Sequence, residues 1–364
     1  MQKIKNVKKG IYIWLLMIIA FFVLFNVFKS NMAAMQWLVQ NITTPYKRAM
    51  GAFCSRFSFS VAEIIWAIII IGCITFVIYA IIRTIKEKEN KAVKAFRFAV
   101  TALCIALTVY AGFTFLWGAN YYTPSFNAQS GIEPKPITKQ QLYETTCFFA
   151  DKANETAVLT QRTANGLYKA DLSDVFAKSK GLYSEIEIEY PFIKGADLGA
   201  KPMYFSKILS IANYTGFYFP FTGESNINID APSAFIPSTI AHEIAHQRGI
   251  APEQTANFLA VRVCELSKDV NYNYSGWLMG YVYLINALYS ADKTMYQAVA
   301  DKMSPLVNAD LEYNNVYWQK YESKVADAVD ATYSGFLKSY SQELGSKSYG
   351  AVVDLLVAYY GNGK

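Results

Sequence analysis

The chain has 364 residues, of which 53% are hydrophobic and 17% charged, and its formal net charge is +6. So high a hydrophobic share is unusual for a soluble protein. Residues 1–117 hold 14 basic and 3 acidic residues, whereas residues 118–364 hold 20 and 25. The positive charge therefore lies beside the apolar segments, which excludes a nucleic-acid-binding surface and favours contact with a lipid bilayer.

Three apolar segments lie in the first third of the chain, at about 11–28, 64–82 and 98–117. Each has the length that spans the hydrocarbon core of a membrane. Buried core helices are the alternative, but helices of globular proteins rarely lack a polar face over such a length. The first segment exceeds the apolar part of a signal peptide, so we expect a retained anchor. Residues 1–117 are thus predicted to be a membrane anchor with three transmembrane helices.

Basic residues predict the orientation of this anchor. Lysines precede the first segment, and the loop between the second and third segments holds six basic residues, whereas the loop between the first and second is poorer in charge. By the positive-inside rule, the N-terminus and the second loop face the cytoplasm. Because the number of spans is odd, everything after Trp117 is expected to be extracytoplasmic.

The residues after the third span show the first signs of a folded domain. Residues 118–137 contain several prolines and predict an extended linker. Thr138, with Gln141 three residues later, has the pattern of a capping box and predicts a helix to about Arg162. Alternating Glu and Ile residues at 185–192 predict a short, half-exposed strand.

The predicted domain, residues 138–364, is mainly α with a small strand component. An aromatic segment at 216–228 predicts an irregular strand pair, and Ser238 is the expected cap of a helix over 239–248. This strand pair either offers an edge to an extended peptide or packs on the following helix. The other expected helices lie near 205–212, 252–269, 275–290, 292–302, 310–329 and 348–360.

The only two histidines of the chain, His242 and His246, lie in one HExxH pentapeptide with Glu243 between them. On a helix, residues four apart share a face, so both imidazoles can bind one zinc ion. Glu243 can then reach a water beside that ion. None of the five cysteines shows a metal-binding spacing, and free thiols are expected rather than a Cys147–Cys264 disulfide.

A catalytic zinc site needs a third protein ligand, and a carboxylate must provide it because no third histidine exists. Glu253, seven residues after His246, is one candidate, with Asn257 one helical turn further on. Glu265 is the other, with Asp269 one turn further on. In either pair the second side chain could orient a ligand imidazole.

The Glu253…Ala256-Asn257…Ala260 pattern after HExxH resembles that of gluzincins, including the heat-shock membrane protease and CAAX-processing types, in which the first Glu binds zinc. More of the chain resembles an uncharacterised bacterial membrane family, domain of unknown function 3810. This resemblance implies a zincin-like domain in a bacterial cell membrane, but no substrate. It rests on Asn120-Tyr121-Tyr122, Pro220–Glu224, His242–Gly249, Glu253, Ala256-Asn257 and Ser348-Tyr349-Gly350.

Glu253 is the preferred ligand because Gly249 lets the chain reverse after the histidine helix and Pro252 can open the next helix. The expected function is zinc-dependent hydrolysis of a peptide or protein substrate, with Glu243 as the general base. A tyrosine, for which Tyr349 is one candidate, is expected to stabilise the oxyanion. The main alternative is a signalling or scaffolding membrane protein with a regulatory or structural zinc site, and a third possibility is hydrolysis of a non-peptide amide, for example in cell-wall material.

Overall fold

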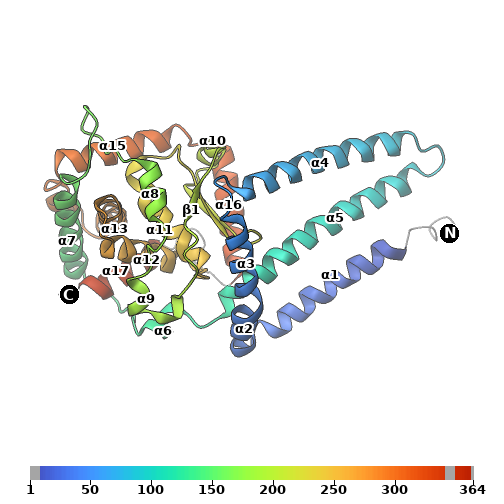
Figure 1. Cartoon of the computed structure of the whole chain (residues 1–364), viewed down its shortest axis with the longest axis horizontal. Coiled ribbons are helices and arrows are strands. Elements are labelled where there is room, and N and C mark those ends of the chain that lie inside the picture. Colours follow the sequence, from blue (N-terminus) through green and yellow to red (C-terminus); the bar gives the residue numbers. More distant parts are fainter. Residues whose placement is uncertain (1–8, 341–348, 362–364) are drawn as a thin grey trace. The chain divides into compact units, whose positions relative to one another are not determined.

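The computed structural model describes residues 9–340 and 349–361 (Figure 1). It divides the chain into two compact units. Residues 1–47 and 61–123 form the first unit, and residues 48–60 and 124–364 form the second. Helices dominate both units, and the strands of the described residues form one small sheet.

Three long helices dominate the first unit: α1 (Lys9–Phe28), α4 (Val61–Ile85) and α5 (Lys91–Leu116). All three are long and apolar enough to cross a membrane, as the sequence predicts, and α5 packs against the other two. Most of their large apolar side chains face outward, which indicates association with a membrane. The shorter elements are α2 (Met32–Leu38), η2 (Val39–Thr43) and η3 (Gly118–Tyr122), and α3 (Thr44–Cys54) belongs partly to each unit.

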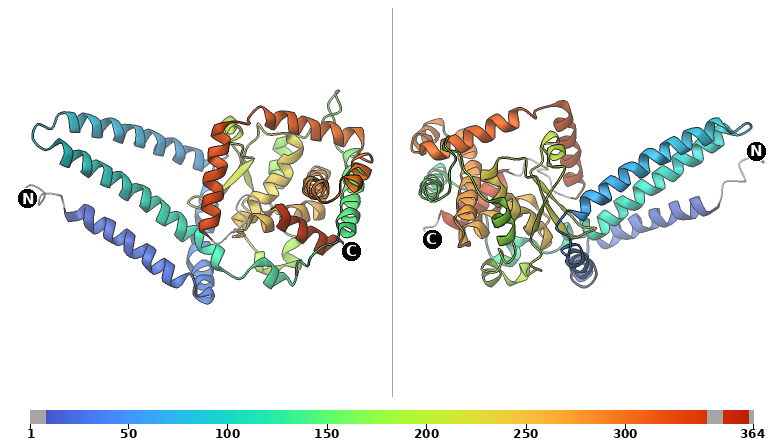
Figure 2. Two further views of the ribbon diagram at one scale, coloured as in Figure 1. Left: turned by 180° about the vertical axis from the view of Figure 1, so that it is seen from behind. Right: turned by 45° about the horizontal axis from the view of Figure 1, so that its top comes forward.

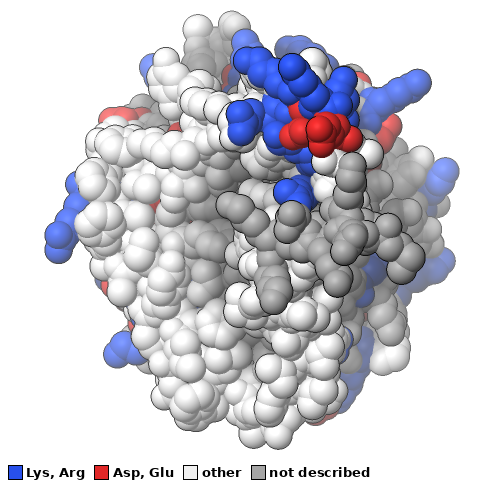
Figure 3. Space-filling model, turned by 90° about the vertical axis from the view of Figure 1, so that its right-hand side faces the viewer, with Lys and Arg blue, Asp and Glu red and all other residues white. Residues whose placement is uncertain are grey.

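The turn between α4 and α5 is strongly basic. Figure 3 shows Lys and Arg side chains gathered there around a few acidic ones, next to helix surfaces that carry little charge. An apolar helix pair that ends in a basic turn is typical of spans that end at lipid headgroups. The basic residues of this turn and of the adjoining helix ends are Arg83, Lys86, Lys88, Lys91, Lys94 and Arg97.

Residues 48–60 fold with the second unit although they precede α4 in the chain. The Lys201 ammonium group donates to the backbone carbonyl of Cys54 at 2.6 Å, and Ser60 Oγ donates to Asn226 Oδ1 at 2.6 Å. The expected boundary at residue 117 therefore leaves out a segment that belongs to the C-terminal unit.

The sheet of the second unit has the order β1-β3-β2. β1 (Ala200–Pro202) pairs in parallel with β3 (Glu224–Ile227), which pairs antiparallel with β2 (Gly216–Phe219). Gly223, with φ 70°, makes the turn that joins β2 to β3. This confirms the strand pair predicted at 216–228 and leaves β2 at an edge of the sheet.

The core of the second unit lies among α7 (Lys139–Ala157), α11 (Ile236–Gln247), α12 (Glu253–Leu266), α13 (Val270–Ala291) and α17 (Tyr349–Tyr360). α13 contacts all the other four. In Figures 1 and 2, α15 (Pro305–Gln319) and α16 (Lys324–Ser339) run along the outside of this unit. The remaining elements are α6 (Phe126–Ser130), α8 (Leu172–Lys178), α9 (Ile186–Glu189), η4 (Pro191–Ile193), α10 (Ser206–Ile211), η5 (Ser233–Phe235) and α14 (Lys293–Ala300).

Several expected helices are present with changed bounds. The Thr138–Gln141 capping box opens α7 as predicted, but the helix ends at Ala157. The single helix expected at 310–329 is two helices, because Ser323 caps the start of α16. The expected linker at 118–137 is partly packed, since Phe126 is buried in the core.

The strand predicted at 185–192 is wrong, because this segment forms α9 and η4. In a strand the two isoleucines would share one face, whereas the helix buries Ile186 and leaves Ile188 77% exposed. Two of its three glutamates also have arginine partners. Glu187 pairs with Arg248 at 2.5 Å, and Glu189 pairs with Arg262 at 2.9 Å.

Ser238 was expected to cap the histidine helix, but α11 already begins at Ile236, with Pro237 in its first turn. Proline fits this position because its fixed φ suits a helix and its missing N–H is not needed there. Ser238 lies inside the helix. Its backbone N–H donates to Ser275 Oγ of α13 at 2.9 Å.

Close packing of α13 against α12 depends on Gly276. A Cβ at this position would collide with Cys264 Cβ and lie 3.4 Å from the Val261 carbonyl oxygen. We expect Gly276→Ala to lower the free energy of unfolding by about 1–3 kcal/mol, the usual cost of overpacking. Denaturation of the detergent-solubilised protein measures this change.

Gly335→Ala is the matched control, because Gly335 lies inside α16 and a Cβ there would meet nothing within 4 Å. This change should raise stability by up to about 1 kcal/mol, since alanine favours helix. Equal effects of the two substitutions would contradict close packing at Gly276.

Candidate metal centre

The two histidines lie one turn apart on the same face of α11. Their Nε2 atoms are 3.0 Å apart, and the two rings stand nearly perpendicular to each other. This placement follows from the spacing of four residues on a helix of 3.6 residues per turn. Both ring edges thus point to one spot beside the helix.

A glycine at the end of α11 turns the chain back toward the histidines. Gly249 has φ 93°, a left-handed conformation that favours glycine. Its N–H bonds the carbonyl oxygen of His246 at 2.9 Å, and the N–H of Ile250 bonds that of Ala245 at 3.1 Å. These two bonds form a Schellman motif, which ends the helix and directs the chain into α12.

Glu253, the first residue of α12, meets the two imidazoles after this reversal. Its Oε2 lies 3.3 Å from His242 Nε2, and its Oε1 lies 3.6 Å from His246 Nε2. Within the described residues, this is the group of three His, Cys, Asp or Glu side chains placed to hold a metal ion. The sequence-preferred carboxylate is therefore the one that the fold brings to the histidines.

The spacing of the three ligand atoms can be compared with that around a metal ion. Ligands at 2.0–2.1 Å from a tetrahedral zinc ion are about 3.3–3.4 Å from one another. The two Nε2 atoms are 3.0 Å apart, and they lie 3.3 and 3.6 Å from the two different oxygens of the Glu253 carboxylate, all close to that value. Two imidazoles and one carboxylate thus lie close enough to one another to share a single small divalent ion.

Two further contacts orient the cluster. His246 Nδ1 lies 2.6 Å from the carbonyl oxygen of Ile250, which can only accept, so Nδ1 carries the proton and donates it. The hydroxyl of Tyr333, on α16, donates to Glu253 Oε1. Tyr333 is a site residue that sequence reasoning missed, because no motif or spacing connects it to a ligand 80 residues earlier.

Charge is unevenly shared within the cluster. Burial lowers the pKa of His246, but the charge and hydrogen bond of Glu253 outweigh it and raise this pKa to about 9. Burial raises the pKa of Glu253, but His246 and His242 outweigh it and hold this pKa well below the usual range. The carboxylate therefore stays ionised and attracts a cation.

Glu243 lies on α11 directly after His242, and its side chain is buried. Burial raises the pKa of its carboxyl group above the usual range, and the negative charge of Glu253 adds to that rise. Among the described residues, no hydrogen bond reaches its Oε2. One carboxylate oxygen with a raised proton affinity and no protein partner is suited to accept a proton from a small molecule.

The edge strand β2 runs beside Glu243. In an antiparallel pair, every second residue directs its backbone N–H and C=O groups toward the partner strand. The Asn228 N–H bonds the carbonyl oxygen of Thr215 at 2.9 Å, so Thr215 is one of these residues. The backbone groups of Gly216 and Tyr218 therefore face away from β3. The N–H of Tyr218 accordingly bonds the Glu243 carboxylate. A Cβ at Gly216 would lie 3.0 Å from Glu243 Cγ, so glycine permits this close approach.

The alternative ligand, Glu265, is engaged elsewhere. Its carboxylate accepts from Arg262 and, at 2.5 Å, from the hydroxyl of Tyr360, and it is not part of the cluster. Asn257 is buried one turn after Glu253, but no hydrogen bond links its side chain to either imidazole in the described part of the chain. The carbonyl of Ile250 makes the contact to an imidazole that was expected from Asn257, and the hydroxyl of Tyr333 orients Glu253.

The other candidates of the sequence analysis contribute no further ligand. All five cysteines are free thiols, including Cys147 and Cys264. The side chain of Tyr349 lies outside the described residues.

Residues 38–357 match the family DUF3810, which is described as a protein of unknown function. Comparisons with curated proteins and with solved structures give no match. The matched range contains α4, α5, the sheet and the whole His-His-Glu cluster. The chain belongs to the DUF3810 family.

Proposed function

We propose that this protein is a membrane-anchored zinc-dependent hydrolase of the gluzincin type, which cleaves peptide bonds outside the cytoplasm. The convergence of His242, His246 and Glu253 beside the buried carboxyl group of Glu243 carries this proposal. Two nitrogen ligands and one oxygen ligand are a set that zinc binds in catalytic sites, where a fourth position stays open.

Bound zinc would lower the pKa of a coordinated water to about 7 and polarise the substrate carbonyl. Glu243 Oε2 accepts the proton of the attacking water and passes it to the leaving nitrogen. Its raised pKa favours acceptance of this proton. The bond from the Tyr218 N–H fixes the carboxylate for this step.

The outward-facing backbone groups of Gly216 lie on β2, next to the proposed base. An extended peptide could add to this edge by backbone hydrogen bonds, as in other strand-addition complexes. Such pairing would place an amide bond beside Glu243 whatever the side chains of the substrate.

We further propose that α1, α4 and α5 all cross the bilayer and that residues after α5 lie outside the cytoplasm. The basic turn between α4 and α5 supports a cytoplasmic position for that turn. An odd number of spans then carries the metal centre to the other side.

Glu243→Gln should lower the rate of hydrolysis by about 10²–10⁴-fold, the usual contribution of a general base. Zinc content and melting temperature should stay unchanged. Turnover of a peptide mixture and metal analysis of the purified full-length protein measure the two effects. Loss of zinc from this variant would show that Glu243 has been given the wrong role. Undiminished turnover would refute it as the base.

Glu253→Ala and Glu265→Ala separate the two candidate ligands. Glu253→Ala should weaken zinc binding by more than about 100-fold, because loss of a ligand costs more than the roughly 10–100-fold that is usual for loss of a residue that only orients a ligand. Glu265→Ala should keep one zinc per chain, and Arg262 retains Glu189 as its partner. The reverse pattern would exclude the proposed cluster as the metal site.

An alkaline phosphatase reporter tests the orientation, because the enzyme needs disulfide bonds that form outside the cytoplasm. Fused after Lys364 it should be active, and inserted at Lys88, between α4 and α5, it should be inactive. Activity of the Lys88 fusion alone would reverse the proposed topology.

A further inference from the structure

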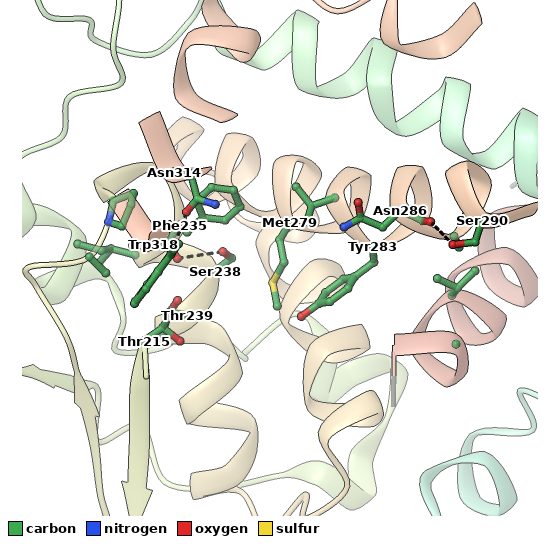
Figure 4. A pocket seen from close by; sticks show the side chains of 17 residues that line it. Thr215, Phe235, Ser238, Thr239, Met279, Tyr283, Asn286, Ser290, Asn314 and Trp318 are labelled. Carbon is green, nitrogen blue, oxygen red and sulfur yellow. Dashed lines mark hydrogen bonds between the residues drawn. The ribbon is translucent and has the colours of Figure 1, made fainter. Parts of the chain in front are cut away.

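A groove of about 640 Å³ lies between α11 and α13 in the second unit (Figure 4). One end reaches Thr239 and Thr215. Thr239 precedes His242 by three residues, about 4.5 Å along the helix axis, and Thr215 directly precedes Gly216 of β2. We call this space the α13 groove; Thr215, Phe235, Thr239, Met279, Asn286 and Trp318 are among its lining residues.

One face of α13 forms a long wall of the groove. The lining residues from Met279 to Ser290 follow the spacing of a single helix face, and Figure 4 shows their side chains in a row. From Met279 to Ser290 the helix rises about 16 Å, which matches about five residues of extended peptide. Asn286 and Ser290 are exposed, so the end away from the metal centre opens to solvent.

The groove is lined by uncharged side chains: none of the described lining residues is Asp, Glu, Lys or Arg. Phe235, Met279 and Trp318 supply apolar surface. Asn286 and Asn314 supply amides, and in the described part of the chain neither side-chain nitrogen has a hydrogen-bond partner. Such a lining suits a peptide with uncharged side chains, because the apolar surface can contact those side chains and the amides can hydrogen-bond the peptide backbone.

We propose that the α13 groove binds the part of a polypeptide substrate next to the bond that is cut, and selects a run of uncharged, apolar residues there. This inference rests on the proposed hydrolase function and deepens it by naming the substrate class. A charged side chain in the groove would lose its hydration and find no opposite charge, whereas an apolar one gains by leaving water.

The test uses the zinc-loaded full-length protein with Glu243→Gln, which is expected to bind substrates without cutting them. Two fluorescent peptides of equal length are compared, one with apolar residues and one in which lysines replace them. The apolar peptide should bind at least about tenfold more tightly. Equal affinity would overturn the proposal.

Asn314→Asp, added to the Glu243→Gln protein, places a carboxylate in the groove with almost no change of shape. It should reduce the preference for the apolar peptide about tenfold by attracting lysine. Asn315→Asp is the matched control, because it makes the same change at the next residue, which is exposed and outside the lining. An equal response to both changes would mean that the groove is not where the peptide binds.

Cleavage of a randomised peptide mixture by the wild-type protein separates this proposal from the hydrolase proposal. Selective binding of the apolar peptide without any cleavage would support the proposed role of the groove and refute the proposed hydrolase function. Cleavage that accepts charged residues at every position near the cut would support the hydrolase and refute the groove.

Discussion

The site depends on one constraint: the half-buried carboxylate of Glu253 needs the two imidazoles of α11 as partners. Burial alone would raise the pKa of this carboxylate, but the two imidazoles hold it well below the usual range, and Tyr333 donates a hydrogen bond to the carboxylate. Without the reversal at Gly249, α12 would not start beside the histidines. A short backbone motif therefore determines where the negative charge of the site lies.

Contacts with the rest of the second unit fix the position of α11 beside Glu253. Two of its carbonyl groups accept hydrogen bonds from outside the helix, Ala241 from the Tyr183 hydroxyl at 2.7 Å and Glu243 from Ser225 Oγ at 2.8 Å. Because Ser225 belongs to β3, the sheet is fixed to the helix at the proposed base. The position of Glu243 is thus set by buried contacts and not by the loop that follows the helix.

Local patterns predicted the centre of this site, since HExxH, Gly249 and the start of α12 at Glu253 lie within 12 residues of one another. The contact from Tyr333 could not be predicted, because it depends on how α16 packs. The strand expected at 185–192 failed for a similar reason: two of its glutamates pair with Arg248, directly after α11, and with Arg262 of α12, which a local pattern of alternation does not contain. Tertiary contacts, which no local pattern contains, decide the structure at both places.

The central claim is that His242, His246 and Glu253 hold one zinc ion. X-ray absorption spectroscopy of the purified full-length protein, with its metal content measured on the same sample, tests this claim most directly. The account predicts about one zinc per chain, bound by imidazole nitrogen and by oxygen with no sulfur in the coordination sphere. Absence of stoichiometric metal, or a zinc ion bound through sulfur, would contradict it.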